Sequence, residues 1–377
     1  MIYFGLALAG CAAPAQVDLR IATGDSAEGL APHRLMISLF RERNPGLSVQ
    51  LEPVSGSDYY TRLLTEMASG VPPDVVHLGD EALSSFVRRQ ALLPLDPLNP
   101  EEYLPGVLEP GAGYLVPKDF TPLVCYCNAR LFRQAGISLP RPDWDWAEFA
   151  RLASRLKVDL PGPRSGLLEY MVALEGGDWS RFSGAAAELA VARLQDLVQT
   201  GACPPPEDLG AFDGGLNGFE QGTAAFKLSG RWPLNSLKQL LGKDLLILPP
   251  PRGSHRVNLL YWSGLGVCRK SRQPELARRY VELCASPEAS QIWSGWGLPA
   301  VRSQASRMAA DPLERVFLEE MQYLAPRAFQ RDPSWGELGA PALIRLHEAA
   351  ILQPHRAPSE LLAEQSARLA REKAARP

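Results

Sequence analysis

The first part of the chain alternates between strand-like and helix-like patterns of hydrophobic residues. Residues 17–21 alternate apolar and polar side chains as a half-buried strand does, and residues 35–40 carry apolar side chains at helical spacing. Residues 47–78 repeat this order, ending in an apolar run typical of a buried strand. Because strand and helix alternate, we predict an α/β fold with a mainly parallel sheet covered by helices on both faces.

In an open parallel sheet, ligands bind beyond the carboxyl ends of the strands. The side chains that follow the predicted strands are therefore candidate ligand-binding residues: Asp25, Tyr59, Asp80 and Glu81. Each has a structural alternative. Asp25 could only cap a helix, Tyr59 could only pack, and the two acids after the third strand could cap a helix or be solvated.

The remaining chain continues the mixture of elements. A proline-rich stretch over 94–117 interrupts the periodicity and is typical of a connecting segment. We expect Asp143 to cap the next helix. Further strands are predicted at 123–126, 245–248 and 257–268, and helices at 146–156, 185–197, 219–225, 276–284, 313–324, 342–352 and 358–372.

The amino terminus has a different character. Residues 1–10 are almost wholly apolar and lead through Leu8-Ala9-Gly10 into Cys11. This resembles the lipobox of bacterial lipoproteins, in which the chain is cleaved before the cysteine and the thiol receives a lipid. We therefore expect residues 1–11 to be a processing signal with a lipidated Cys11, and the mature chain to be exported and anchored in the membrane. No later apolar run approaches the ~20 residues that cross a bilayer.

Composition narrows the classes of function. The 377 residues, 46% hydrophobic and 21% charged, have the balance of a globular protein with two domains or one divided domain. A formal net charge of -3 lacks the positive charge that nucleic-acid binders use, so no nucleic-acid partner is expected. The cysteines after Cys11 have no further Cys or His at ligand spacing, which predicts no metal site and favours buried thiols, with one disulfide as the alternative; they are Cys125, Cys127, Cys203, Cys268 and Cys284.

No motif indicates an enzyme. The chain contains no nucleophile elbow, zinc-protease motif, phosphate loop or dinucleotide fingerprint. Asp80 and Glu81 are adjacent in sequence, and glycosidase acids must flank one bond at ~5 to 9 Å, which neighbouring residues rarely do. We therefore predict a binding protein that needs no cofactor.

Six short motifs follow one another in a set order. They are Asn44-Pro45-Gly46, the stretch from Ser69-Gly70 to Asp74-Val75, Leu93-Pro94-Leu95, the run from Cys127-Asn128 to Ala135-Gly136, Trp146-Ala147-Glu148, and Phe219 to Phe226 followed by Gly230-Arg231-Trp232. In this order they resemble the family 1 extracellular solute-binding proteins, which include maltose-binding and other oligosaccharide-binding proteins of ABC importers. Phe226, Cys127 and Ser263 depart from the residues common in that family.

The resemblance implies the fold of a periplasmic binding protein, in which two α/β lobes are joined by a hinge and enclose a ligand cleft. It implies an N-terminal lobe over 17–123 and 266–297 and a C-terminal lobe over 124–265 and 298–377. We expect Gly264 and Gly266 to let a crossing strand bend as the lobes close. The implied partners are a small solute and the permease subunits of an ABC importer, with the chain a monomer.

The same resemblance adds candidate ligand-binding residues. A sugar offers hydroxyls and C–H faces, which planar polar side chains and aromatic faces complement. Trp232 stands where the family commonly places a sugar-stacking aromatic residue. Trp262 and Trp335 are further candidates, with Trp262 preferred to Trp296.

The identity of the ligand is left open by two arginines. Arg231 and Arg302 could meet an anionic solute, so a glycerophosphate-like or other polar solute is the alternative to the expected oligosaccharide. A sensor lipoprotein that presents its ligand to a receptor is the alternative to a component of an importer.

Overall fold

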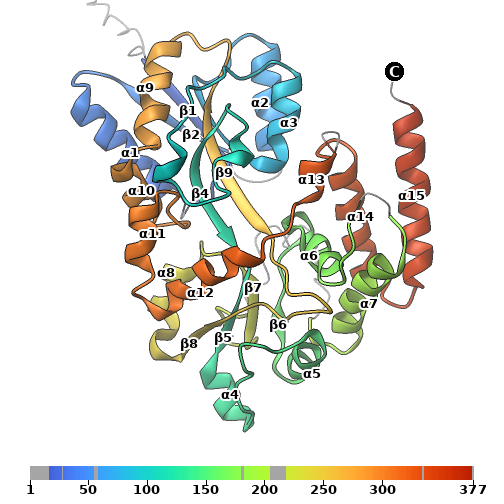
Figure 1. Cartoon of the computed structure of the whole chain (residues 1–377). Coiled ribbons are helices and arrows are strands. Elements are labelled where there is room, and N and C mark those ends of the chain that lie inside the picture. Colours follow the sequence, from blue (N-terminus) through green and yellow to red (C-terminus); the bar gives the residue numbers. More distant parts are fainter. Residues whose placement is uncertain are drawn as a thin grey trace, which may run out of the picture.

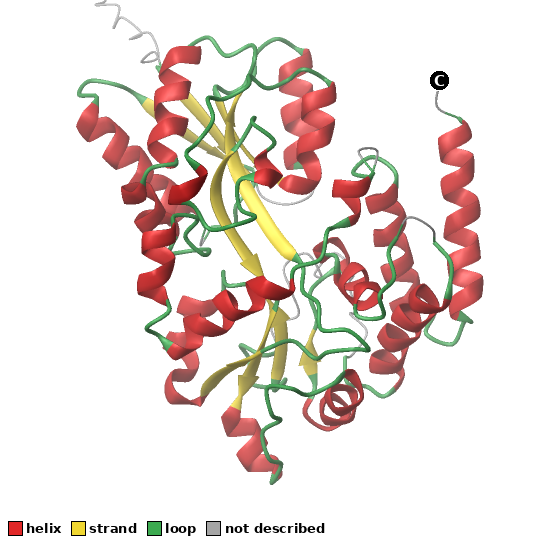
Figure 2. Cartoon of the chain, in the orientation of Figure 1, coloured by secondary structure: helices red, strands yellow, loops and turns green. Residues whose placement is uncertain are grey.

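The computed structural model describes residues 17–27, 29–54, 58–179, 182–203, 218–332 and 335–375. These residues form two sheets, each with its own helices (Figure 1 and Figure 2). The predicted α/β fold with two lobes is confirmed. Cys11 and the predicted signal lie outside the described residues, and within those residues no helix is long and apolar enough to span a membrane.

The first lobe is built on a five-stranded sheet in the order β2-β1-β3-β9-β4. The strands are β1 (Leu19–Thr23), β2 (Val49–Pro53), β3 (Val75–Gly79), β4 (Val116–Pro122) and β9 (Leu260–Val267). Strand β1 pairs in parallel with β2 and β3, whereas β9 runs antiparallel between β3 and β4. The prediction of parallel strands is thus right for the first three. It misses β4, whose first residues overlap the end of the predicted connecting segment.

Helices cover both faces of this sheet, as predicted. Leu19, Ile21 and Val75 face one hydrophobic core, whereas Ala22 and Val76 face another, because alternate residues of a strand point to opposite sides. One face carries α1 (Leu30–Arg43), α9 (Pro274–Cys284) and α10 (Pro287–Trp293), and the other carries α2 (Tyr59–Ala68) and α3 (Asp80–Arg88) (Figure 1).

The second lobe is built on a four-stranded sheet in the order β6-β7-β5-β8. Its strands are β5 (Val124–Asn128), β6 (Val158–Asp159), β7 (Phe226–Ser229) and β8 (Leu245–Leu248). A large core joins them to the surrounding helices. These helices are α4 (Ala129–Ala135), α5 (Trp146–Leu156), α6 (Leu167–Ala173), α7 (Ala185–Gln199), α13 (Ala328–Arg331), α14 (Gly339–Leu352) and α15 (Pro358–Ala374). Helix α8 (Leu234–Leu241) instead contributes Leu234 and Leu237 to the core that also contains Ala22 and Val76.

Three local predictions have clear outcomes. Residues 219–225 form turns instead of a helix. Asp145, not Asp143, caps α5, because its Oδ1 accepts a hydrogen bond of 2.8 Å from the backbone N–H of Glu148, three residues along. The expected buried thiols are confirmed: Cys125, Cys127, Cys203, Cys268 and Cys284 are buried, and no disulfide joins them within the described part of the chain.

The chain passes between the lobes three times. It crosses at Leu123, between β4 and β5, again over 249–259, between β8 and β9, and a third time through α11 (Arg302–Met308) and α12 (Pro312–Glu320). All of β9 pairs within the first sheet, so the sheet of the first lobe takes in residues 260–265, which we had placed in the second lobe.

The two glycines expected to act as hinges serve packing. Gly264 and Gly266 lie inside β9, paired with residues of β3. A Cβ at Gly264 would lie 2.6 Å from the carbonyl oxygen of Val116, and one at Gly266 would lie 2.6 Å from Leu115. Their lack of a side chain lets neighbouring groups approach the strand, and bending at these positions stays a prediction.

The crossing segments are held together by Asn258. Its buried side chain accepts a hydrogen bond from the N–H of Leu123 and donates one to the carbonyl of the same residue, both at 2.9 Å. The same amide donates to Glu320 at 2.9 Å, and the backbone of Asn258 pairs with Leu324. One side chain therefore joins all three connections between the lobes.

Candidate ligand-binding site

Asp25, in the loop after β1, is fixed by a buried ammonium group. Its Oδ2 lies 3.0 Å from Nζ of Lys118 and 2.8 Å from Nε2 of His33, and its Oδ1 lies 3.7 Å from Nδ1 of His77. Lys118, on β4, has no exposed side-chain surface and also contacts Asp119. The Asp25 carboxylate itself stays 11% exposed. Lys118 and His33 therefore hold the Asp25 carboxylate in place, while part of its side chain stays accessible from the surface.

The electrostatics of this cluster keep the acid ionised. Burial acts to raise the pKa of Asp25, but the charge of Lys118 and the interactions with His77 and His33 hold that pKa well below its usual range. Burial acts to lower the pKa of Lys118, but Asp119 and Asp25 outweigh it and raise the pKa. Burial lowers the pKa of His77 to about 4, so this imidazole is neutral at neutral pH.

Asp25, His33 and His77 could by their chemistry hold a metal ion, since one ligand atom from each lies within 4.8 Å of the others. A cation there would share the carboxylate with the ammonium of Lys118, which lies 3.0 Å from the same oxygen. The repulsion between two buried positive charges makes this a poor metal site, and the cluster is better described as an anchored carboxylate.

Further polar groups of the first lobe lie beside this cluster. Asp119 accepts a hydrogen bond of 2.8 Å from the hydroxyl of Ser263 on β9. The indole of Trp296 and the side chain of Asp25 both lie against Gly29. A Cβ added at Gly29 would lie 3.3 Å from Trp296 and 2.9 Å from Asp25. The side chains of Asp25, Asp119, Ser263 and Trp296 are all partly exposed.

Asp80 and Glu81 begin α3 directly beyond β3. Gly79, the last residue of β3, pairs with Ser263, so the two acids stand next to the Asp119–Ser263 pair. Both carboxyl oxygens of Asp80 are buried without a hydrogen-bond partner among the described residues. Burial raises the pKa of Asp80 well above its usual range, although the charge of Arg327 opposes the rise. Glu81 accepts a hydrogen bond of 2.9 Å from Tyr60. Asp80 thus has hydrogen-bonding capacity to offer a ligand.

Aromatic and basic groups face these acids from the second lobe and the start of β9. The ring of Tyr261 meets that of Trp232 edge to face, with centroids 6.0 Å apart. The guanidinium of Arg327 lies 5.0 Å from the Tyr261 ring and forms an ion pair of 3.1 Å with Glu169. Trp232 is 38% exposed, which is unusual for so large an apolar side chain. Part of its indole is therefore open to contact.

Tyr261 and Ser263 stand two residues apart on β9 and thus point to the same side of the sheet. The loop over 335–338 closes this side, since Glu337 binds Arg88 at 2.9 Å and Ser85 at 3.3 Å on α3. We call the whole set the interlobe surface: Asp25, Asp80, Glu81, Asp119, Trp232, Tyr261, Ser263, Trp296 and Arg327.

The sequence-predicted residues divide into two groups. Asp25, Asp80, Glu81 and Trp232 belong to the interlobe surface. The other four are placed by the structure in packing or in contacts away from it.

Tyr59 is buried and its hydroxyl donates to the carbonyl oxygens of His77 at 2.7 Å and Ala22 at 3.0 Å. Trp262 is 3% exposed and its indole N–H donates to Val107 at 2.8 Å. Both residues therefore pack inside the first lobe. For Trp262 the preference over Trp296 is wrong, because neighbouring residues of β9 point to opposite sides.

The other two predicted residues also have structural partners. Trp335 is 5% exposed and stacks on Phe182, with ring centroids 6.2 Å apart, in the core of the second lobe. The guanidinium of Arg302 donates to Tyr103 O at 2.9 Å, which ties α11 to the loop over 100–103. Arg231, also considered for an anionic solute, is buried and forms two hydrogen bonds of 2.7 Å with the carboxylate of Glu314.

Sequence reasoning missed Lys118, Asp119, Tyr261, Ser263 and Arg327. Alternation along β9 was a usable signal, since it places Tyr261 and Ser263 opposite the large apolar Trp262. The pair Lys118-Asp119 stands between prolines, which obscured the strand.

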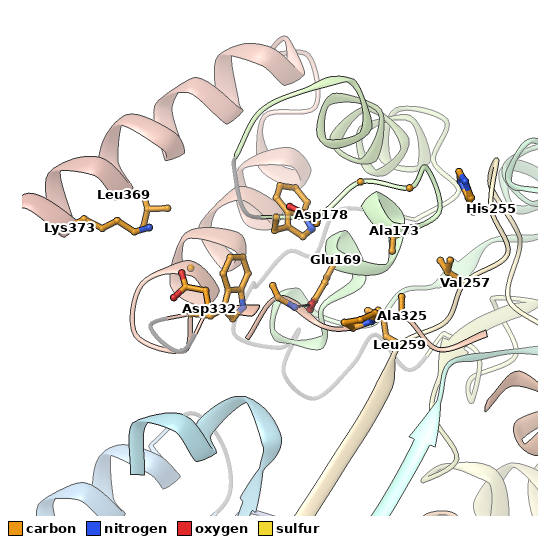
Figure 3. A pocket seen from close by; sticks show the side chains of 17 residues that line it. Glu169, Ala173, Asp178, His255, Val257, Leu259, Ala325, Asp332, Leu369 and Lys373 are labelled. Carbon is orange, nitrogen blue, oxygen red and sulfur yellow. Dashed lines mark hydrogen bonds between the residues drawn. The ribbon is translucent and has the colours of Figure 1, made fainter. Parts of the chain in front are cut away.

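A separate cavity of about 300 Å³ lies within the second lobe (Figure 3). It is bounded by the end of α6 and the loop after it, by the segment before β9, by the 325–339 region and by α15, with Trp179, Val257 and Leu369 among its apolar lining. Glu169 lines it and also binds Arg327, so the cavity adjoins the interlobe surface without being part of it.

Comparison with solved structures supports the fold. The ABC substrate-binding protein of Listeria monocytogenes in complex with cycloalternan is 18% identical, with a TM-score of 0.80 over 94% of this chain and 98% of that one. UgpB of Mycobacterium tuberculosis in complex with glycerophosphocholine is 19% identical, with a TM-score of 0.77 over 94% and 98%. These similarities extend over both lobes.

Sequence comparisons identify the family. A binding protein of Brucella abortus is 28% identical over 163 residues, which are 41% of this chain and only 38% of that relative. The family model described as bacterial extracellular solute-binding protein matches residues 23–291, well over half of the chain. The chain therefore belongs to the bacterial extracellular solute-binding proteins.

Proposed function

We propose that this chain is the substrate-binding component of an ABC importer and captures a carbohydrate, specifically an oligosaccharide, between its two lobes. The observation that carries the proposal is the interlobe surface, which combines anchored carboxylates with an exposed tryptophan. Membership of a solute-binding family confirms the prediction of a binding protein in place of an enzyme. Capture would proceed without covalent chemistry, by a shift of the two lobes toward a closed form that the ligand favours.

The chemistry of the interlobe surface suits a sugar. The partly exposed indole of Trp232 can stack on the C–H face of a pyranose ring. The carboxylates of Asp25 and Glu81 are held by Lys118 and Tyr60, respectively, and can accept hydrogen bonds from ring hydroxyls in fixed geometry. The carboxyl of Asp80 lies beside them, with both oxygens buried and without a hydrogen-bond partner among the described residues.

Charge favours a neutral sugar over a phosphorylated solute. The cations at or near the interlobe surface already face acids: Lys118 binds Asp25, Arg231 binds Glu314 and Arg327 binds Glu169. A phosphate would have to displace one of these carboxylates and would meet Asp80 and Glu81 as it did so. Arg302, the other candidate for an anion, binds the backbone of the first lobe.

Binding should be tested by a thermal-shift screen of neutral oligosaccharides and glycerophosphodiesters, followed by calorimetry on the hits. Asp25→Asn should weaken sugar binding at least tenfold, because the Asp25 side chain is partly exposed, its pKa is held well below its usual range, and a hydrogen bond to a charged group is worth about 1.5 to 3 kcal/mol. The exposed Asp96 provides the matched control Asp96→Asn, which should bind as the native protein does. Selective binding of glycerophosphodiesters would refute the carbohydrate assignment, and turnover of a bound glycan would refute a role confined to binding.

We further propose export and attachment to the membrane through a lipid on Cys11. Membership of an extracellular family supports export. Metabolic labelling with palmitate should mark the native chain, and Cys11→Ser should abolish the label. Uptake of the bound sugar should fall when the gene is deleted; unchanged uptake with a lost transcriptional response would instead indicate a sensor.

A further inference from the structure

The first lobe has a basic hollow at the end of its sheet where β9 terminates. Strand β9 enters the sheet from the second lobe and ends at Val267, so residues 268–270 mark the far end. A hollow of about 250 Å³ opens there. Its floor is apolar and is formed by Leu64, Met67, Ala68, Pro72, Ala91 and Cys268. Its rim is basic and is formed by Arg89, Arg269 and Lys270.

Of the three basic side chains of the rim, Arg89 forms an ion pair of 3.4 Å with Glu337, whereas the charge of the other two is not balanced locally. None of the residues that line the hollow is acidic. Arg269 donates to the backbone carbonyl of Gln90 at 2.8 Å, and neither Arg269 nor Lys270 forms an ion pair with any residue that the structure describes. Arg272 adds an exposed cation just beyond. Val71, at the turn before β3, is 46% exposed, so an apolar contact stands beside the charges.

The amino-terminal end of the described chain emerges at the same end of the sheet. The N–H of Asp74 bonds to Arg20 O at 2.9 Å, and the N–H of Cys268 bonds to Asp74 O at 3.0 Å. These residues of β1, β3 and β9 therefore lie side by side, with β1 and β9 ~10 Å apart at two strand spacings. Even a fully extended chain reaches only ~20 Å from Cys11 to Val17. A lipid on Cys11 would thus hold this end of the lobe close to the membrane.

We infer that this hollow binds the head groups of anionic phospholipids and holds the outer end of the first lobe against the membrane. Paired cations attract the phosphate of such a head group, and each contributes near a charged bilayer. The apolar floor and Val71 suit the glycerol and upper acyl region. The role in orienting the chain rests on the proposed lipidation of Cys11, whereas head-group binding can be measured without the lipid.

The test uses the mature polypeptide, residues 11–377 with Cys11→Ser, and sedimentation with vesicles. Binding is expected with vesicles of phosphatidylglycerol mixed with phosphatidylcholine, and not with phosphatidylcholine alone. The double variant Arg269→Gln/Lys270→Gln should bind the mixed vesicles about 30-fold more weakly, from the contribution of two basic residues at an anionic surface. Raising the salt concentration should weaken binding of the parent polypeptide.

A matched control removes the same charge from the second lobe. Arg141 and Lys243 are exposed there, so Arg141→Gln/Lys243→Gln should keep the affinity of the parent. Equal weakening by both double variants, or no binding to anionic vesicles, would overturn the inference. Thermal unfolding of each variant verifies its folding. Sugar binding by calorimetry is a separate readout, so failure here and failure of the proposed transport function can be told apart.

Discussion

Replacing Lys118 by methionine tests how the candidate site is held together. Methionine keeps much of the length of the side chain and removes its charge. In the native protein the buried ammonium lies 3.0 Å from Asp25 and also contacts Asp119, and no other lysine or arginine among the described residues forms an ion pair with Asp25. Removing one partner of a buried ion pair costs about 3 to 5 kcal/mol, and here the two carboxylates remain in place. We expect the free energy of unfolding to fall by this amount at pH 7.

The loss should depend on pH with a definite sign. Lys118 helps to hold the pKa of native Asp25 well below its usual range, so the stability contributed by this acid is present above its unfolded pKa of about 3.9. In Lys118→Met the pKa of Asp25 should rise, because burial remains while the opposing charge is gone. Protonation then relieves the penalty, so the difference from the native protein should shrink between pH 7 and pH 5.

Denaturant unfolding followed by tryptophan fluorescence measures this effect at both pH values. The double variant Lys118→Met/Asp25→Asn should recover part of the stability, since it removes one stranded charge. The exposed Lys243 gives the control Lys243→Met, which should stay within about 0.5 kcal/mol of the native protein. A loss below about 1 kcal/mol in Lys118→Met, or no recovery in the double variant, would refute the view of Lys118 as the anchor of these carboxylates.

Three further outcomes are expected. Trp232→Ala should weaken ligand binding by about 1 to 3 kcal/mol in calorimetry, because one stacking face is lost, whereas Leu240→Ala, at another exposed apolar residue of the second lobe, should not; equal affinities would remove Trp232 from the site. Glu337→Gln should lower ligand affinity by no more than about fivefold, because the ion pair of Glu337 with Arg88 joins the two lobes but is partly exposed. Tighter ligand binding by this variant in calorimetry would contradict the view that the ion pair favours the closed form. Burial lowers the pKa of His77 to about 4, so between pH 6.5 and pH 4 the unfolded chain binds more protons than the folded chain. The free energy of unfolding should therefore decrease as the pH is lowered over this range, by up to about 3 kcal/mol from this residue. A free energy of unfolding that stays constant over this range in denaturant unfolding would contradict the prediction.

Local patterns in the sequence predicted three of the nine residues of the interlobe surface: Asp25, Asp80 and Glu81. Asp25 and Asp80 were found because the position beyond the carboxyl end of a parallel strand follows from the strand itself. Trp232 was found through the family resemblance. These predictions needed only short-range information or a motif.

The remaining part of the site depends on pairing between distant segments. Lys118 and Asp119 reach the site because β4 pairs with β9, more than a hundred residues later, and local periodicity carries no signal of that pairing. Tyr59 shows the opposite error. Its position in sequence suited a ligand contact, but its hydroxyl is used by two backbone carbonyl groups of the sheet.

The position of Asn258 bears on how the lobes can move. Its side chain binds both backbone groups of Leu123 and also Glu320, so the three connections would lose buried hydrogen bonds if they separated. We therefore expect the connections to stay together as a pivot while the lobes rotate about it. The pair of Glu337 with Arg88 is partly exposed and weak, so it can open and close at little cost. The buried hydrogen bonds of Asn258 keep the connections together, whereas the contact between α3 and the 335–338 loop is weak. A bound ligand can therefore shift the equilibrium between the open and closed forms.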